Sequence, residues 1–149
     1  MSPLPFFMQG EVVKGFGRGS KDLGCPTANY SRDLNKTIPK DFKTGVYCGW
    51  AQVDTQPVYR MVVNIGWCPF YQNEDMSVET HILHEFENDF YGSNLKICLV
   101  EFLRPEMNFT SPDGLIKQIA TDIANAHNIL DLPEHMKFRE NDYFSNDAK

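Results

Sequence analysis

A glycine-rich stretch between Gly15 and Asn29, with the sequence GFGRGSKDLGCPTAN, carries the groups expected of a phosphate-binding loop. Its glycines let backbone N–H groups approach a phosphate closely, and Lys21 adds a positive charge. Thr27 and Asn29 offer a hydroxyl and an amide oxygen two residues apart, on one side of an extended segment. Such oxygens suit a hard cation such as Mg²⁺. A plain glycine-rich surface loop explains the same residues equally well, so both interpretations stay open.

This stretch is neither a Walker A loop nor a Rossmann fingerprint. Gly19 and Gly24 have the Walker spacing, but Cys25 and Pro26 stand where a Lys and a Ser or Thr must be. No third glycine completes the Rossmann triplet, and Pro26 leaves no room for the helix that must follow it. A phosphate site here would therefore belong to another class.

A second candidate lies in SVETHILHEF, residues 77–86, where polar groups sit inside a strand-like run. Strand alternation puts Glu79 and His81 on one face, and Thr80 and His84 on the other. A carboxylate among apolar neighbours can act as a general base, which a kinase needs to orient a substrate hydroxyl. A solvated edge strand is the plainer explanation of a lone Glu. Zinc binding at the two histidines is disfavoured, because they lie on opposite faces.

The elements that must position these groups are short strands followed by one helix. The turn-like residues Asp54 to Pro57 separate two of the strands as a hairpin. The expected strands are residues 7–14, 45–53, 58–67, 77–86 and 95–103.

The expected helix covers residues 112–130, with Ser111 as N-cap, Pro112 first and Asp113 in the first turn. Strands followed by a helix predict a small antiparallel β-barrel or sandwich with a C-terminal helix packed on it. The apolar stripe of that helix consists of Leu115, Ile116, Ile119, Ile123, Ala126 and Leu130.

Composition favours one globular domain, because 42% of the 149 residues are hydrophobic. The net charge is −6, which disfavours nucleic-acid binding. Residues 1–60 hold eight Lys/Arg and five Asp/Glu, so the basic excess surrounds the glycine-rich stretch and suits a small anionic ligand. No apolar run is long enough for a membrane span.

The four cysteines form no CxxC pair, and the N-terminus shows no signal peptide. We therefore expect free thiols and a cytoplasmic protein.

Several segments together resemble the eukaryotic riboflavin kinase (flavokinase) family, in order along nearly the whole chain. The most specific of them are the PTAN and ETHI motifs. The segments are GEVVKGFGRGSK (10–21), LGCPTAN (23–29), GVY (45–47), MVV (61–63), IGW (65–67), ETHI (79–82), DFYG (89–92), LRPE (103–106) and LPEH (132–135).

The resemblance implies a mainly β fold, a six-stranded antiparallel Greek-key β-barrel with a C-terminal α-helix packed on it, forming one kinase domain over residues 1–149. It implies ATP and riboflavin as substrates, FMN and ADP as products, and Mg²⁺ or another divalent ion, zinc included, as the metal. We expect a monomer that needs neither a nucleic acid nor a membrane.

By the same resemblance, Glu79 is the catalytic base, and Thr27 and Asn29 bind the metal and the nucleotide phosphates. The other nucleotide-site residues are Gly15, Lys21, Ile82, His84 and Tyr91. The flavin-site residues are Arg104, Met107 and Phe109, where Met107 replaces the Lys expected in the family. One alternative is a flavin-binding module without catalysis, and the intact PTAN and Glu79 argue against it, because flavin binding needs neither metal ligands nor a base. The other is a β domain for surface interactions, for which the basic loop and the carboxylate would be a coincidence.

Overall fold

The structure is a computed structural model that describes residues 4–13, 28–30, 34, 37–39, 41–67, 76–83, 92–106, 112–140 and 144. At positions 28, 29, 67, 112 and 115 only the backbone belongs to this description. The strands are β1 (Phe6–Glu11), β2 (Ala28–Asn29), β3 (Gly45–Val53), β4 (Tyr59–Trp67), β5 (Met76–Ile82) and β6 (Asn94–Arg104). The helices are α2 (Pro112–Leu130) and α3 (Pro133–Met136), and a 3₁₀ turn η2 (Lys137–Glu140) follows them.

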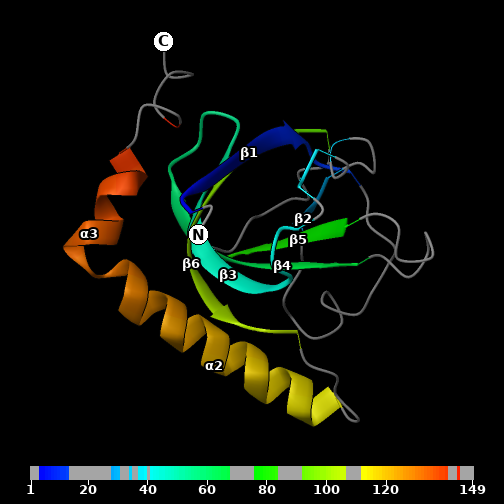
Figure 1. The fold of residues 1–149 in the computed structure, drawn as a ribbon. Helices are drawn as coiled ribbons and strands as arrows, with labels where there is room; N and C mark the ends of the chain where they lie inside the picture. The colour runs from blue at the N-terminus through cyan, green and yellow to red at the C-terminus, as the bar shows by residue number, and fades with distance from the viewer. Residues whose placement is uncertain are drawn as a thin grey trace.

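The strands form one antiparallel sheet in the order β1-β6-β3-β4-β5-β2. Three strands in sequence, β3 to β5, lie side by side, and β6 returns to lie next to β3, which is the order of a Greek key. Figure 1 shows the sheet curving around its interior, with α2 running along the outside. The mainly β, antiparallel architecture with a C-terminal helix agrees with the prediction.

The prediction of a closed six-stranded barrel is corrected by this topology. Five strands have six residues or more, whereas β2 has two. Within the described residues, no pairing joins β1 to β2 at the two ends of the sheet order. The described sheet is therefore an open half-barrel. The sequence before β2 is rich in glycine and includes Pro26, and both residue types disfavour strands.

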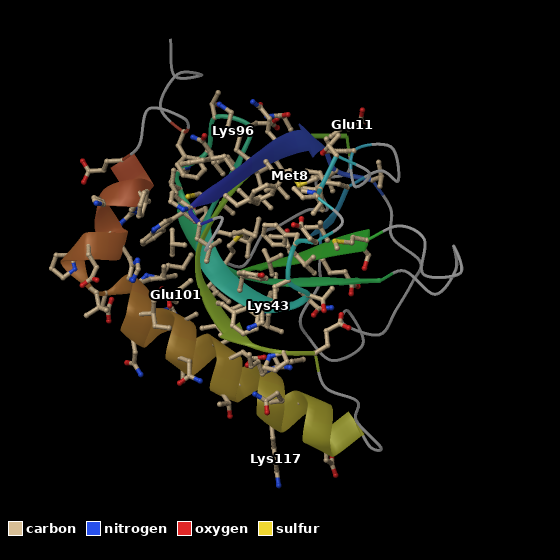
Figure 2. The ribbon with its side chains drawn as sticks, in the orientation of Figure 1. Met8, Glu11, Lys43, Lys96, Glu101 and Lys117 are labelled. Atoms are coloured by element: carbon tan, nitrogen blue, oxygen red, sulfur yellow. The ribbon has the colours of Figure 1, made fainter. Side chains whose placement is uncertain are left out.

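The inner face of the half-barrel is an apolar core. In β5, buried residues alternate with partly exposed ones, as expected for a strand with one buried face. Figure 2 shows Met8 of β1 inside the curve of the sheet. The strand residues of this core include Met8, Met61, Val63, Ile65, Val78, Ile82, Leu95, Ile97 and Leu99.

The outer face is partly covered by α2, which begins at Pro112 as predicted and has Asp113 in its first turn. Ala126 and Leu130 of the predicted stripe are fully buried against the sheet. Ile116 is not in this contact, because its side chain is 45% exposed. At 100° per residue it lies about 80° around the helix from Ala126, at the flank of the stripe. Among the described residues, no helix is both long and apolar enough to cross a membrane.

The C-terminal part of α2 and the segment after it are tied to the outer face by polar contacts. Arg60 of β4 pairs with Asp131 and contacts the His127 ring at 2.9 Å. The indole Nε1 of Trp50 donates to the carbonyl oxygen of His135 at 3.1 Å. These contacts set the direction of α2 across the sheet, so that its N-terminal half lies toward the end of β4.

Two cysteines, Cys48 and Cys98, are buried free thiols between the sheet and α2. Burial raises the pKa of each thiol to about 12, and for Cys48 the nearby Glu101 carboxylate adds to the effect. Cys25 and Cys68 lie outside the described residues.

We expect both buried thiols to resist alkylation in the native protein at pH 8, because the thiolate is the nucleophile and each thiol stays protonated. Peptide mass spectrometry after iodoacetamide treatment would find Cys48 and Cys98 unmodified. The same treatment in urea should alkylate both. Alkylation of either residue in the native protein at the denatured rate would contradict the prediction.

Candidate functional site

Glu79 lies on the outer face of β5, the same face that carries the α2 contacts elsewhere in the sheet. Its neighbours along the strand, Val78 and Thr80, are buried on the inner face, while Glu79 and His81 are partly exposed. The predicted division of Glu79 and His81 from Thr80 between the two faces is therefore confirmed, whereas His84 lies outside the described residues. Burial lowers the pKa of His81, so its imidazole is biased toward the neutral form.

The strand register brings three predicted site positions into one row across the sheet. Asn29 of β2 lies opposite Glu79 of β5, and Glu79 lies opposite Asn64 of β4. Asn64 in turn lies opposite Val46 of β3, which lies opposite Arg104 of β6. Directly opposite residues share a face of the sheet, with Cβ atoms about 4.5–5.5 Å apart. Positions separated by up to 75 residues in sequence thus lie in one row on the outer face.

Tyr30 anchors the chain directly after Asn29. Its ring is buried, and its hydroxyl donates to the carbonyl oxygen of Leu95 on β6 at 2.7 Å. This bond crosses the interior of the half-barrel, because β2 and β6 belong to distant parts of the sheet. A two-residue strand has few ladder bonds of its own, so the anchor helps to fix the position of Asn29 opposite Glu79.

Arg104 reaches the outer face through an irregularity in the pairing of β3 with β6. Phe102 lies opposite Tyr47 and packs against the inner core. Simple alternation from Phe102 would turn Arg104 inward as well. The register shifts between Val46 and Tyr47, so Arg104 instead faces outward toward α2.

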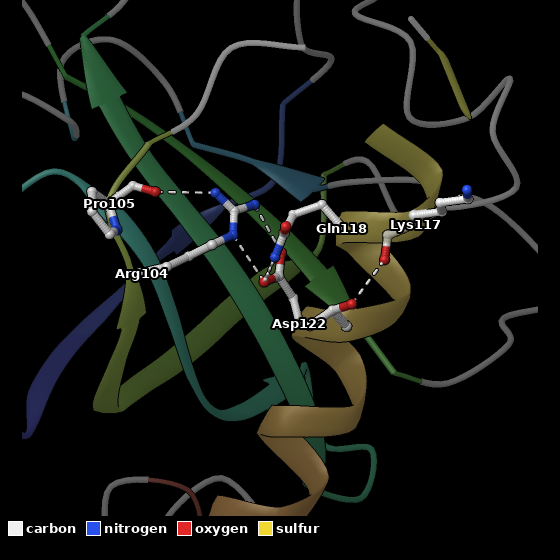
Figure 3. A network of polar contacts seen from close by, with 6 residues as sticks. Arg104, Pro105, Lys117, Gln118 and Asp122 are labelled. Atoms are coloured by element: carbon white, nitrogen blue, oxygen red, sulfur yellow. Dashed lines mark hydrogen bonds and ion pairs between the residues drawn. The ribbon is translucent and has the colours of Figure 1, made fainter. Parts of the chain in front are cut away.

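The guanidinium of Arg104 is held by Asp122 of α2 (Figure 3). Nε donates to Oδ1 at 2.9 Å and Nη2 donates to Oδ2 at 2.8 Å, while Nη1 donates to the carbonyl oxygen of Pro105 at 3.0 Å. Gln118 also donates to Oδ1, at 3.1 Å. Asp122 has only 5% of its side chain exposed, and Arg104 has 17%. This ion pair fastens the end of β6 to the middle of α2.

Glu106 follows two residues later, and its carboxylate lies against Gly66 of β4. A Cβ on Gly66 would lie 1.8 Å from Oε1 of Glu106, so a side chain there would displace the carboxylate. Gly66 lies opposite Ser77, one step along the same face from the Asn64–Glu79 pair. Burial raises the pKa of Glu106, and the charge of Arg104 partly opposes this effect.

Ile82 has its side chain in the inner core, 5% exposed. Leu83 N–H donates to the carbonyl oxygen of Arg60, which marks these two as a hydrogen-bonded pair of the β4–β5 ladder. In an antiparallel ladder, hydrogen-bonded pairs alternate with pairs that are not hydrogen-bonded, so the next pair, Met61 with Ile82, is of the second kind. The N–H and C=O of Ile82 therefore point away from β4, toward the edge that β2 occupies.

Seven predicted residues lie outside the described part of the chain, so their placement stays a prediction. They are Gly15, Lys21, Thr27, His84, Tyr91, Met107 and Phe109. The same holds for the side chain of Asn29. Sequence reasoning also missed two residues of the outer surface, Asn64 and Asp122. Each is a polar residue inside an apolar pattern, which was the available signal.

The residue types in the row fit a hard divalent cation better than zinc. Asn29, Asn64 and Glu79 are amide and carboxylate residues, and oxygen donors of this kind are what Mg²⁺ prefers. Zinc prefers Cys and His ligands. Within the described ranges, no group of three or more His, Cys, Asp and Glu side chains could hold a metal.

Comparisons with known proteins agree with the resemblance seen in the motifs. The Flavokinase family model, described as riboflavin kinase, matches residues 2–130. The riboflavin kinases of Mus musculus and Homo sapiens are each 51% identical over 144 residues, covering 97% of this chain and 93% of theirs. The crystal structure of riboflavin kinase from Trypanosoma brucei is similar with a TM-score of 0.76 and 28% identity, covering 95% of this chain and 89% of that one.

The chain has a curved antiparallel sheet backed by a C-terminal helix, and it is similar to kinases over nearly its whole length. These two findings place the protein among the phosphate-transferring enzymes. The chain belongs to the riboflavin kinase family.

Two Arg–Asp ion pairs join the sheet to the helical segment, Arg104 with Asp122 and Arg60 with Asp131. They should contribute very differently to the free energy of unfolding. Asp122→Asn removes one partner of a buried pair and should lower the free energy of unfolding by about 3 kcal/mol. Asp131→Asn, whose side chain is 63% exposed, is the matched control and should cost less than about 1 kcal/mol. Urea unfolding followed by circular dichroism would measure both. Equal losses would contradict the structural assignment.

Proposed function

We propose that the protein transfers the γ-phosphoryl group of ATP to the 5′-hydroxyl of riboflavin, with FMN and ADP as products. Membership of the riboflavin kinase family supports the reaction. The single observation that supports its chemistry at this site is the register in which Asn29 lies directly opposite Glu79. The predicted metal ligand Asn29 and the predicted base Glu79 would thus both lie beside the γ-phosphoryl group and the 5′-hydroxyl that react.

Glu79 is the proposed general base in a direct in-line transfer. The 5′-hydroxyl oxygen attacks the γ-phosphorus, and the bond from that phosphorus to the bridging oxygen breaks as ADP leaves. The hydroxyl proton passes to the Glu79 carboxylate, and no phospho-enzyme forms. The protein acts mainly by positioning, which is the usual requirement of phosphoryl transfer.

Thr27 and Asn29 are the residues that would hold Mg²⁺, and another divalent ion could take its place. When bound, the ion supplies positive charge that neutralises the nucleotide phosphates. Oxygen ligands fit this role, as do the residue types in the Asn29–Glu79–Asn64 row.

The remaining predicted residues divide between two substrates. Gly15, Lys21, His84 and Tyr91 would contact ATP, together with Ile82. Because the Ile82 side chain is in the core, its contact with the nucleotide would be made by its backbone N–H and C=O, which point toward the edge that β2 occupies.

Arg104, Met107 and Phe109 would contact the flavin. The Nε and Nη2 atoms of Arg104 each have one hydrogen bond to Asp122. Its contact with flavin would therefore use the second N–H of a terminal nitrogen or the backbone. We further propose that residues 1–149 act as one domain, as a monomer in the cytoplasm, on these small molecules.

Purified protein with riboflavin, ATP and Mg²⁺ should form FMN, measured by chromatography, and EDTA should abolish the product because the phosphates lose their counter-charge. An excess of Mg²⁺ over EDTA is the control. Flavin binding without any FMN would contradict the proposed function and indicate a binding module.

Glu79→Gln should lower turnover by about 10²–10⁴-fold, the usual range for a positioned base, while flavin affinity and the fold are retained. Glu11→Gln is the matched control, since Glu11 is an exposed strand residue at the other end of the sheet order. Turnover measured with saturating substrates would test this. Turnover of Glu79→Gln close to that of the control would remove Glu79 from the role.

A further inference from the structure

We propose that Glu106 binds hydroxyl groups of the ribityl chain of riboflavin, as a second carboxylate on the surface that carries Glu79. The inference rests on the proposed function. It assigns a substrate contact to a residue that lies between the predicted flavin-site positions Arg104 and Met107.

The position of the Glu106 carboxylate is unusual for an exposed glutamate. It does not extend away from the protein but lies against the backbone of Gly66, in the space where a side chain would otherwise be. With the residues that the structure describes, Glu106 has no hydrogen bond. Its charge is partly desolvated, since burial raises its pKa. A carboxylate held in this way gains free energy from hydroxyl donors of a ligand.

The same face of the sheet carries both carboxylates. Gly66 pairs with Ser77, and Asn64 pairs with Glu79, which are two successive outward-facing rows of β4 and β5. Such rows are about 7 Å apart along a strand. If the terminal hydroxyl of the ribityl chain is at Glu79, the earlier hydroxyls of the chain come within reach of Glu106.

The backbone just before Glu106 is held by contacts with α2 and with the start of β3. Asp122 of α2 orients Arg104, and Nη1 of Arg104 binds the carbonyl oxygen of Pro105 directly before Glu106. The chain also passes close to the start of β3, where a Cβ on Gly45 would lie 2.5 Å from the carbonyl oxygen of Arg104. Gly45 has φ of 143°, a conformation that side chains disfavour. Asp122 is therefore a positioning residue for this contact.

The two halves of riboflavin differ in their hydrogen-bonding groups, and this difference indicates which half the Glu106 carboxylate binds. The pyrimidine edge of the isoalloxazine ring presents a single N–H donor between two carbonyl oxygens, which a carboxylate repels. The ribityl chain presents several hydroxyl donors, which a carboxylate accepts. The geometry therefore points to the polyol rather than the ring.

The first test compares riboflavin with lumiflavin, which has a methyl group in place of the ribityl chain. Glu106→Ala should weaken riboflavin binding, measured by quenching of flavin fluorescence, by about 10- to 100-fold, as expected for loss of a charge-assisted hydrogen bond. Lumiflavin affinity should not change, and Glu106→Gln should restore part of the riboflavin affinity. An equal loss for both flavins, or no loss for either, would overturn the proposal.

Steady-state kinetics provide a second readout. The KM for riboflavin should rise in Glu106→Ala while the KM for ATP does not change. Glu134→Ala, which replaces an exposed glutamate of α3, is the control and should alter neither value. Absence of FMN in the wild-type protein would refute the proposed function, and the two-flavin binding comparison would still decide the role of Glu106.

Gly66→Ala fills the space that the Glu106 carboxylate occupies, without removing Glu106 itself. The new methyl group would collide with a flexible side-chain end, so the variant should fold, and it should weaken riboflavin binding as Glu106→Ala does. In the double variant Gly66→Ala/Glu106→Ala, the two losses of riboflavin affinity should not add, because there is no Glu106 carboxylate left to displace. Additive losses would show that Gly66 acts independently and would overturn the assignment.

Discussion

The pairing register of the antiparallel sheet is the constraint on which the candidate site depends. A slip of one residue between β4 and β5 would turn Glu79 into the core and bring Thr80 to the outer face. The slip is prevented by burial, because Val78 and Ile82 pack on the inner face only in the observed register. The apolar core on the inner face therefore determines which polar residues lie side by side on the outer face.

The helix α2 adds a second constraint on the same surface. It covers the part of the outer face formed by residues such as Cys48 and Trp50, and it leaves Glu79 partly exposed. Figure 2 shows Lys117 on the side of α2 that faces away from the sheet. The buried pair of Arg104 with Asp122 joins this helix to the end of β6, so the helix both shields the sheet and orients the segment that enters the proposed flavin site.

Local patterns predicted most of the elements well. The strand from Gly45 to Val53, the turn after it and the start of α2 at Pro112 are where hydrophobic periodicity and turn residues indicated. The closed barrel was wrong, because closure depends on pairing between strands that are distant in sequence. Ile116 belongs to the predicted apolar stripe of α2, but it is 45% exposed, because it lies at the flank of the stripe.

The sequence by itself determined the family of this protein, the identities of its candidate site residues and the two faces of β5, because these follow from residue types and short-range spacing. Tertiary structure alone decided that Asn29 lies opposite Glu79, that Arg104 turns outward and that Asp122 is its partner. Backbone hydrogen bonds look alike whichever residues they join, so the sequence does not show which positions become neighbours. That choice is made when the whole core packs, and the irregularity that turns Arg104 outward has no local sequence signal.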